Sequence, residues 1–255
     1  MQNKPLNILS ISCCYNGLDI LPYILEYNRK EGIDSFVLDN YSTDGSWEYL
    51  QDNKIPSKRM DTDGAFHVTK IQDAKKEIIH GLKPDWVLRG SSDHFILTPN
   101  SLRETIETVD NDGYNAISMP FYRIKNTGEE RLENGDPRKI YFYYSPHFAQ
   151  ENFGCAIHKV NGFNGYSADD IDMTNIKTYI INGACLLDYG DTRSAEKRDK
   201  EYQRRQLAWG RGEPWLYGRH YVSGSERNWE WEKDTLLDIR ESEYWSMLCD
   251  RFGDV

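Results

Sequence analysis

Short apolar runs alternate with amphipathic, helix-like stretches over the first hundred residues of the chain. Residues 6–13 form an apolar run rich in β-formers, and after a polar loop residues 19–31 have helical character. A second apolar run at residues 35–39 leads through turn residues 40–45 into a helical stretch at residues 46–52. Strands that alternate with helices in this way predict a parallel sheet.

Residues typical of helix ends flank these helical stretches. Asp19 is a suitable N-cap for the first helix, Pro22 falls in its first turn and Gly32 can end it. A third helix is expected between Asp63, as its N-cap, and Gly81, because apolar residues recur there at helical spacing. These signals agree with the alternation of strands and helices.

Polar clusters follow three predicted strands, at residues 15–17, 39–45 and 90–94, the last after a strand at residues 85–89. In open parallel sheets ligands bind beyond the carboxyl ends of the strands, so we expect a ligand site where these clusters meet. The later half is richer in β-formers, and we expect it to extend the sheet and shape an acceptor site. Its apolar runs are residues 116–123, 138–143, 156–160 and 178–187, and a charged helical segment follows at residues 193–211.

Composition limits the kinds of protein and ligand. The chain has 255 residues, of which 38% are hydrophobic and 28% charged, which is typical of a soluble folded protein, and we expect one domain with a C-terminal extension. Its formal net charge of -10 argues against a nucleic-acid partner. A small anionic ligand stays compatible with that charge, because local cations and helix amides act within about 8 Å at physiological salt.

The N-terminal residues and the cysteines indicate a cytoplasmic protein. The first fourteen residues have no basic region, and their apolar run is shorter than the roughly 20 residues of a spanning helix, so we expect no export signal and no transmembrane segment. The five cysteines lack the CxxC spacing of zinc sites, and an odd number fits reduced thiols.

The strongest local motif is Phe-Val-Leu-Asp-Asn-Tyr-Ser-Thr-Asp-Gly-Ser at residues 36–46, an apolar strand that ends in an acidic, hydroxyl-rich turn before a helix. It resembles the hallmark of glycosyltransferase family 2 and its relatives, Asp-Asn-x-Ser-x-Asp-Gly-Ser/Thr. The likeness extends over about residues 6–211. Its other landmarks are Leu21-Pro22-Tyr23, Pro84-Asp85-Trp86, Ser92-Asp93-His94-Phe95, Arg138-Lys139-Ile140, Gly154, His158-Lys159-Val160, Asp188-Tyr189 and Arg193-Ser194.

The resemblance implies a GT-A type α/β fold: a Rossmann-like, mostly parallel central sheet flanked by helices, with a β-rich second half and a helical C-terminal extension. We expect a glycosyltransferase domain over residues 1–211, divided into a nucleotide-binding half (1–115) and an acceptor half (116–211), with residues 212–255 packed on it. The implied activity is transfer of a sugar from a nucleotide diphosphate sugar, UDP-linked, to a saccharide or glycoconjugate acceptor with inversion, as in polysaccharide biosynthesis.

The family's Asp-x-Asp-Glu motif is altered at residues 91–94, where Ser91 replaces the first aspartate and His94 the glutamate. Asp93 can still hold Mn²⁺ or Mg²⁺, since such ions often take one or two carboxylates together with substrate phosphates. His94 or His158 can add a nitrogen ligand suited to Mn²⁺, and Asp188 stands where relatives often have histidine. The alternatives are a turn residue for Asp93 and ordinary, partly buried histidines.

The resemblance assigns the nucleotide end to the first two loops. Tyr15 can stack on the base, Asn16 can hydrogen-bond to it, and Asp39 can accept from the base or the ribose. The neighbouring substrate-binding candidates are Asn40, Ser42, Asp44, Ser92 and His94. Asp44 can instead cap the helix that begins near Ser46.

Two further candidates come from later in the chain. Arg193 can hold the diphosphate in a bidentate contact or begin a solvated helix. Asp170, in an acidic loop at residues 169–172, is our candidate for the general base that takes the acceptor's proton, although such loops are common on surfaces.

Two other functions are open. Loss of the first Asp-x-Asp carboxylate is compatible with a catalytically silent module that binds sugar nucleotides or glycans. Nucleotidyl transfer is disfavoured, because the Gly-rich, Lys-containing phosphate loop expected after the first strand is missing.

Overall fold

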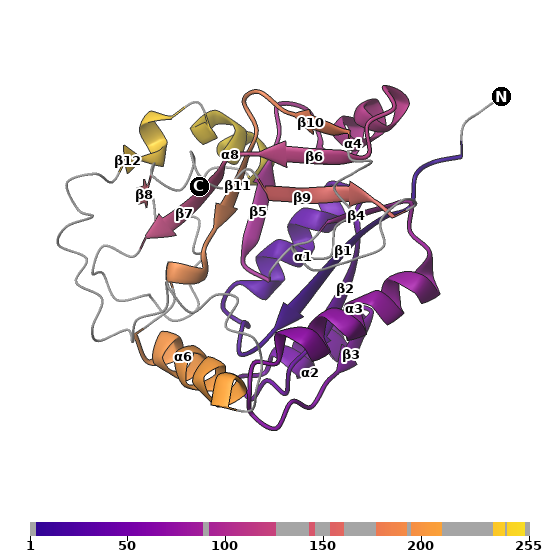
Figure 1. The fold of residues 1–255 in the computed structure, drawn as a ribbon. Helices are drawn as coiled ribbons and strands as arrows, with labels where there is room; N and C mark the ends of the chain where they lie inside the picture. The colour runs from indigo at the N-terminus through magenta and orange to yellow at the C-terminus, as the bar shows by residue number, and fades with distance from the viewer. Residues whose placement is uncertain are drawn as a thin grey trace.

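The computed structural model describes residues 4–88, 92–125, 143–145, 154–160, 177–192, 195–210, 237–242 and 244–252. These residues form a mixed α/β fold with a mostly parallel central sheet flanked by helices (Figure 1). The seven strands of this sheet, in spatial order, are β10 (Thr178–Ile180), β6 (Ala116–Met119), β9 (Gly154–Lys159), β4 (Trp86–Leu88), β1 (Ile8–Cys14), β2 (Asp34–Asp39) and β3 (Ser57–Arg59).

Four of the strand pairs in the central sheet are parallel, and only β9 runs antiparallel to its neighbours β4 and β6. The predicted parallel sheet is therefore confirmed. The carboxyl ends of β1, β2 and β4 lie at the same edge, which is the geometry on which the expected ligand site depends.

A second sheet has the order β12 (Leu237–Asp238), β8 (Tyr143–Ser145), β7 (Phe121–Lys125), β11 (Cys185–Asp188) and β5 (His94–Leu97). Two apolar runs that the sequence pattern treats as single strands are each divided between the two sheets. Pro120 separates β6 from β7, and its carbonyl accepts a hydrogen bond from Leu186 N of β11. Gly183, at a φ of 72°, lies in the turn between β10 and β11.

Helices cover both faces of the central sheet. The helices of the described residues are α1 (Leu21–Lys30), α2 (Ser46–Asp52), α3 (Val68–Leu82), α4 (Leu102–Asn111), α6 (Ala195–Gly210) and α8 (Tyr244–Phe252), of which α6 lies at the carboxyl edge and α8 contacts β5 of the second sheet. Leu9 and Ile11 of β1 pack with Ile79 of α3, whereas Ile8 belongs to the larger cluster that includes residues of α1 and α4. The alternation along β1 follows from the two-residue period of a strand.

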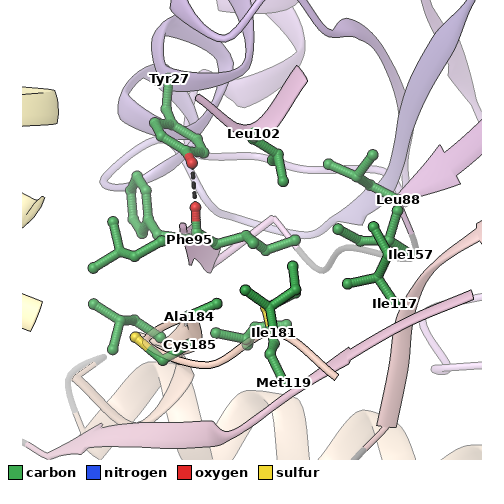
Figure 2. Packing of buried hydrophobic residues seen from close by; sticks show 14 of the residues in the cluster. Tyr27, Leu88, Phe95, Leu102, Ile117, Met119, Ile157, Ile181, Ala184 and Cys185 are labelled. Atoms are coloured by element: carbon green, nitrogen blue, oxygen red, sulfur yellow. Dashed lines mark hydrogen bonds between the residues drawn. The ribbon is translucent and has the colours of Figure 1, made fainter. Parts of the chain in front are cut away.

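The larger cluster lies between α1, β5 and the strands of both sheets (Figure 2). The Tyr27 hydroxyl donates to the Ile96 carbonyl. The Tyr27 and Phe95 rings meet edge to face, with 5.9 Å between their centroids. Tyr244 and Leu248 of α8 join the same cluster, so described residues of the C-terminal segment pack on the same core. Burial raises the pKa of Tyr27 well above its usual value, so this phenol stays protonated and donates.

Two helices begin later than their predicted caps. Asp19 precedes α1, but its carboxylate accepts from Lys197 Nζ at 3.0 Å, and the chain enters the helix through a turn closed by the Gly17 carbonyl. Asp63 has a φ of 51° and lies in the turn before α3, which begins after His67. No helix among the described residues combines the length and apolar composition needed to cross a membrane.

Candidate functional site

The loop after β1 and the loop after β2 are joined by reciprocal hydrogen bonds. The backbone N–H of Asn16 donates to Ser42 Oγ at 2.9 Å, and the backbone N–H of Thr43 donates to Asn16 Oδ1 at 2.8 Å. Asn16 has a φ of 48°, a conformation that asparagine tolerates better than most residues. The two loops therefore form one unit at the carboxyl edge of the sheet.

Asp44 fixes this unit to the start of α2. Its Oδ2 accepts from the backbone N–H of Leu18 at 3.1 Å, and its Oδ1 accepts from the N–H and hydroxyl of Ser46 at 3.1 and 2.6 Å. Ser46 Oγ in turn accepts from Gly17 N at 3.1 Å. The carboxylate of Asp44 thus binds the first residue of α2, while Gly45 occupies the N-cap position itself.

Asp39, at the end of β2, is fully buried. Its carboxylate accepts from Ser42 N at 3.2 and 3.3 Å and from Arg59 Nε at 3.1 Å. The guanidinium of Arg59 also donates to the Ser42 carbonyl at 2.8 Å and lies over the rings of Tyr41 and Trp47 at 4.7 and 5.2 Å. Asp39 and Arg59 thus hold the turn in shape, and the side chain of Tyr41 is half exposed to solvent.

Asn40 and Tyr15 contact α6, a helix that lies off the carboxyl end of β1 (Figure 1). Asn40 Nδ2 donates to Thr62 Oγ1 at 2.7 Å, while its Oδ1 accepts from the guanidinium of Arg204. The same guanidinium stacks on the Tyr15 ring, 3.4 Å from its centroid. Both ends of the Asn40 side-chain amide are therefore hydrogen-bonded within the protein, and the Arg204 guanidinium covers one face of the Tyr15 ring.

Asp93, His94 and Asp188 form a compact group. Each offers one ligand atom, and these atoms all lie within 4.8 Å of one another. His94 Nε2 is 3.8 Å from Asp93 Oδ1 and 3.7 Å from Asp188 Oδ1. Both carboxylates are buried and the imidazole is partly exposed. Two carboxylates and an imidazole at this spacing can hold a divalent cation.

Strand register creates this group. Asp188 of β11 lies directly opposite His94 of β5 and also opposite Arg123 of β7, so the three side chains form a row across the second sheet. Arg123 Nε is 3.4 Å from Asp188 Oδ2. The sequence marks Asp188 only through the resemblance and gives no sign of Arg123, because sheet register joins residues 94, 123 and 188.

The turn after β11 closes against the group. Gly190 N donates to Asp188 Oδ1 at 2.7 Å, and Tyr189 N donates to the Asp93 carbonyl at 2.9 Å. A Cβ at position 190 would lie 2.9 Å from Asp188 Oδ1 and 3.1 Å from Asp93 Oδ2. Only glycine fits at this distance without moving one of the carboxylates.

The two parts of the site meet at Gly17. A Cβ placed there would lie 3.8 Å from Ser92 Oγ, so the β1 loop passes close to the residue next to Asp93. Charged groups also gather around Cys13, near the end of β1. Burial raises the pKa of its thiol to about 11, Lys75 and Arg204 oppose that rise, and Glu201 and Asp39 add to it.

His158 does not join this arrangement. His158 is fully buried and lies opposite Val87, on the sheet face that α3 covers, with Nδ1 3.3 Å from the Lys159 carbonyl. The group around Asp93 in the described part of the chain does not include it. Asp170 and Arg193 lie outside the described residues, and their roles stay predictions.

A cavity of about 500 Å³ lies at the opposite edge of the sheet, between α1 and α2. Asp34, the first residue of β2, lines it together with Tyr23, Arg29 and Tyr49. Asp39 ends the same strand at the other edge, so this cavity is separate from the site around Asp39 and Asp93.

Comparisons with known proteins identify no family. No family model matches the chain, and no curated protein does. Among solved structures, S. aureus TarS residues 1–349 in complex with UDP-GlcNAc is 18% identical, with a TM-score of 0.37 over 49% of this chain and 37% of that one. The same TarS segment with UDP is 16% identical, with a TM-score of 0.37 over 49% of this chain and 38% of that one.

A third structure, mannose-1-phosphate geranyltransferase from Thermus thermophilus, is 13% identical, with a TM-score of 0.29 over 81% of this chain and 65% of that one. This chain therefore spans less than two fifths of the TarS segment that it matches. Scores of this size carry no inference about function, which must come from the residues of the site.

Proposed function

We propose that this protein is a glycosyltransferase that uses a UDP-linked sugar as donor and a saccharide or glycoconjugate as acceptor, with inversion. One observation carries the proposal: the interlocked loops of residues 15–17 and 39–46 lie against the group of Asp93, His94 and Asp188 at a single edge of a parallel sheet. A nucleotide diphosphate sugar requires a surface for its nucleoside beside a site for its diphosphate, and this edge offers both.

The first two loops form the nucleoside end. Tyr15 and Tyr41 present aromatic surface there. Asn16, next to Tyr15, joins the loops that carry these two tyrosines. The buried ion pair of Asp39 with Arg59 fixes the turn, so we assign Asp39 to shaping the base pocket, and Asn40, Ser42 and Asp44 to holding it.

The Asp93 group forms the diphosphate end. Mn²⁺ or Mg²⁺ fits its donor set, since both ions accept carboxylate oxygens and the imidazole nitrogen of His94 suits Mn²⁺. Asp93, His94 and Asp188 would hold the ion, which when bound neutralises charge that develops on the leaving diphosphate. Arg123 stands beside Asp188 and adds a fixed positive charge at the same place. Ser92, Arg193 and the base Asp170 complete the proposed set.

The test is calorimetric titration with UDP, with and without Mn²⁺, followed by an assay of UDP-sugar hydrolysis. We expect UDP to bind in a metal-dependent way. Asp93→Asn should weaken the Mn²⁺-dependent affinity by about 100-fold or more, because it removes one of two carboxylates from the group. The matched control is Asp73→Asn, which removes an exposed carboxylate from α3 and should leave affinity unchanged.

Three results would contradict parts of the proposal. No binding of any nucleotide would reject the donor site as a whole. Affinity that persists in Asp93→Asn would reject the metal assignment. Binding of UDP-sugars without hydrolysis, and without transfer to any acceptor in a glycan panel, would instead favour a silent sugar-nucleotide-binding module.

A further inference from the structure

Helix α6 lies across three loops at the carboxyl edge of the sheet, although it begins well over a hundred residues after the last of them. Near its first turn, Lys197 Nζ donates to the Asn16 carbonyl at 3.3 Å and to Asp19 Oδ2 at 3.0 Å. Near its last turns, the Arg204 carbonyl accepts from Phe66 N at 3.0 Å. The helix therefore bridges the loop after β1 and the loop before α3.

Arg204 makes most of the polar contacts on the underside of α6. Its Nε donates to the Gly64 carbonyl at 3.2 Å, and its Nη2 donates to the Ala65 carbonyl at 3.3 Å and to Asn40 Oδ1. Its guanidinium also stacks on Tyr15. One buried side chain thus fixes three loops, and two of them carry the residues that we assign to the nucleoside.

The guanidinium has one further nitrogen, Nη1, that these hydrogen bonds do not use. Arg204 is 6% exposed, and its Nη1 is buried without a hydrogen-bond acceptor among the described residues. Glu201 Oε2 is 3.8 Å away, beyond hydrogen-bond distance, and Glu201 Oε1 accepts from Arg205 instead. A buried donor without an acceptor lowers the stability of the fold, so the burial of Arg204 is not explained by stability alone.

We infer that α6 completes the base end of the nucleotide site, and that Arg204 is a positioning residue for Tyr15 and Asn40. Docked α6 holds Tyr15 and Asn40 in place, and the Tyr15 face away from Arg204 is the surface on which a base stacks. The inference rests on the proposed nucleotide site but not on sugar transfer.

Linkage gives this inference a specific consequence. If the nucleotide binds better when α6 is docked, binding must stabilise the docked helix by the same free energy. A purely structural Arg204 would stabilise the fold equally with and without nucleotide. Burial lowers the pKa of Arg204, but a guanidinium remains charged at neutral pH, so this coupling should not vary near pH 7.

The experiment compares wild type with Arg204→Met, which keeps the length of the side chain and removes the donors. UDP affinity is measured by calorimetry with Mn²⁺, and hydrogen exchange of the α6 amides is followed with and without UDP. We expect affinity to fall about 10- to 100-fold in Arg204→Met. We also expect UDP to protect α6 from exchange in wild type and not in the variant.

Lys200→Met is the matched control, because Lys200 is exposed on α6, forms its ion pair with exposed Glu196 and donates no hydrogen bond to the three loops in the described part of the chain. It should bind UDP like wild type. Lys197→Met gives a second, milder variant, since its side chain is one third exposed, and it should also lose affinity and α6 protection. If Arg204→Met does not fold, Lys197→Met alone can test whether α6 contributes to UDP binding.

The outcomes separate the two proposals. If wild type binds no nucleotide, the proposed function fails and this inference fails with it. If wild type binds UDP but a folded Arg204→Met binds equally well, only the role of Arg204 is rejected. If wild type binds UDP and α6 exchange is unchanged by it, the coupling of α6 to the site is rejected.

Discussion

Replacement of Gly17 by alanine tests the close approach on which the two-part site depends. A Cβ at position 17 would lie 2.9 Å from Cys14 Sγ and 3.8 Å from Ser92 Oγ. The first distance is about half an ångström shorter than ordinary van der Waals contact. Cys14 is fully buried, so its sulfur has no solvent-filled space to enter.

The cost follows from what holds the loop in place. Gly17 N donates to Ser46 Oγ at 3.1 Å, and the Gly17 carbonyl accepts from Ile20 and Leu21 N–H groups at 2.9 and 2.8 Å. Movement of the loop away from Cys14 would stretch these bonds. Overpacking of this kind costs about 1–3 kcal/mol. In a chain of this length a loss of about 2 kcal/mol lowers the Tm by about 4–8 °C.

A double-mutant cycle with Cys14→Ala identifies the cause. We expect Gly17→Ala alone to lower the Tm and the urea midpoint, and Cys14→Ala to recover at least about 1 kcal/mol of that loss by removing the sulfur. Calorimetry on the same proteins should show weaker UDP binding in Gly17→Ala. The reasoning is refuted if Gly17→Ala is as stable as wild type, or if the two changes are additive within about 0.5 kcal/mol.

Two further predictions concern the core and the thiol at the end of β1. Tyr27→Phe removes the hydroxyl that donates to the Ile96 carbonyl. In urea titrations it should lower the free energy of unfolding by about 1–2 kcal/mol, and it should leave UDP affinity unchanged. Stability equal to that of wild type would show that this hydrogen bond contributes nothing. The pKa of Cys13 is raised to about 11, so its thiolate is about one part in a thousand at pH 8. Its alkylation by iodoacetamide, followed by mass spectrometry, should accelerate about tenfold per pH unit up to that pKa. Reaction at pH 8 at the rate of an ordinary exposed thiol would contradict the raised pKa.

Local sequence signals predict the first half of the fold well, because each strand and helix there is encoded by its own residues. The apolar runs before Asp39 and Asp93 form β2 and β4, and the turn at residues 40–45 lies where its polar residues indicate. Helix starts are predicted less well. Asp19 forms an ion pair with Lys197, 178 residues away, and no pattern near Asp19 contains that information.

The candidate site also combines features that local sequence predicts with features that depend on residues far apart in the chain. The interlocking of Asn16 with Ser42 is within reach of sequence reasoning, since both follow adjacent parallel strands. The row of His94, Asp188 and Arg123 cannot be predicted in this way, because it depends on how β11 aligns with β5 and with β7 in the second sheet. Arg204 is missed for another reason: a charged helix has many arginines, and only its packing shows which one is buried.

The distribution of charge explains why nucleotide affinity should depend on an added divalent cation. Asp93 and Asp188 with Arg123 leave one net negative charge at the proposed diphosphate end, in buried surroundings where charges are poorly screened. Two of the cations at the nucleoside end are already paired with carboxylates, Arg59 with Asp39 and Lys197 with Asp19. A diphosphate would therefore meet repulsion at the Asp93 group unless a divalent cation reversed the local sign. The same count predicts that Arg123→Met makes UDP binding more dependent on Mn²⁺, because it leaves both carboxylates without their fixed positive partner.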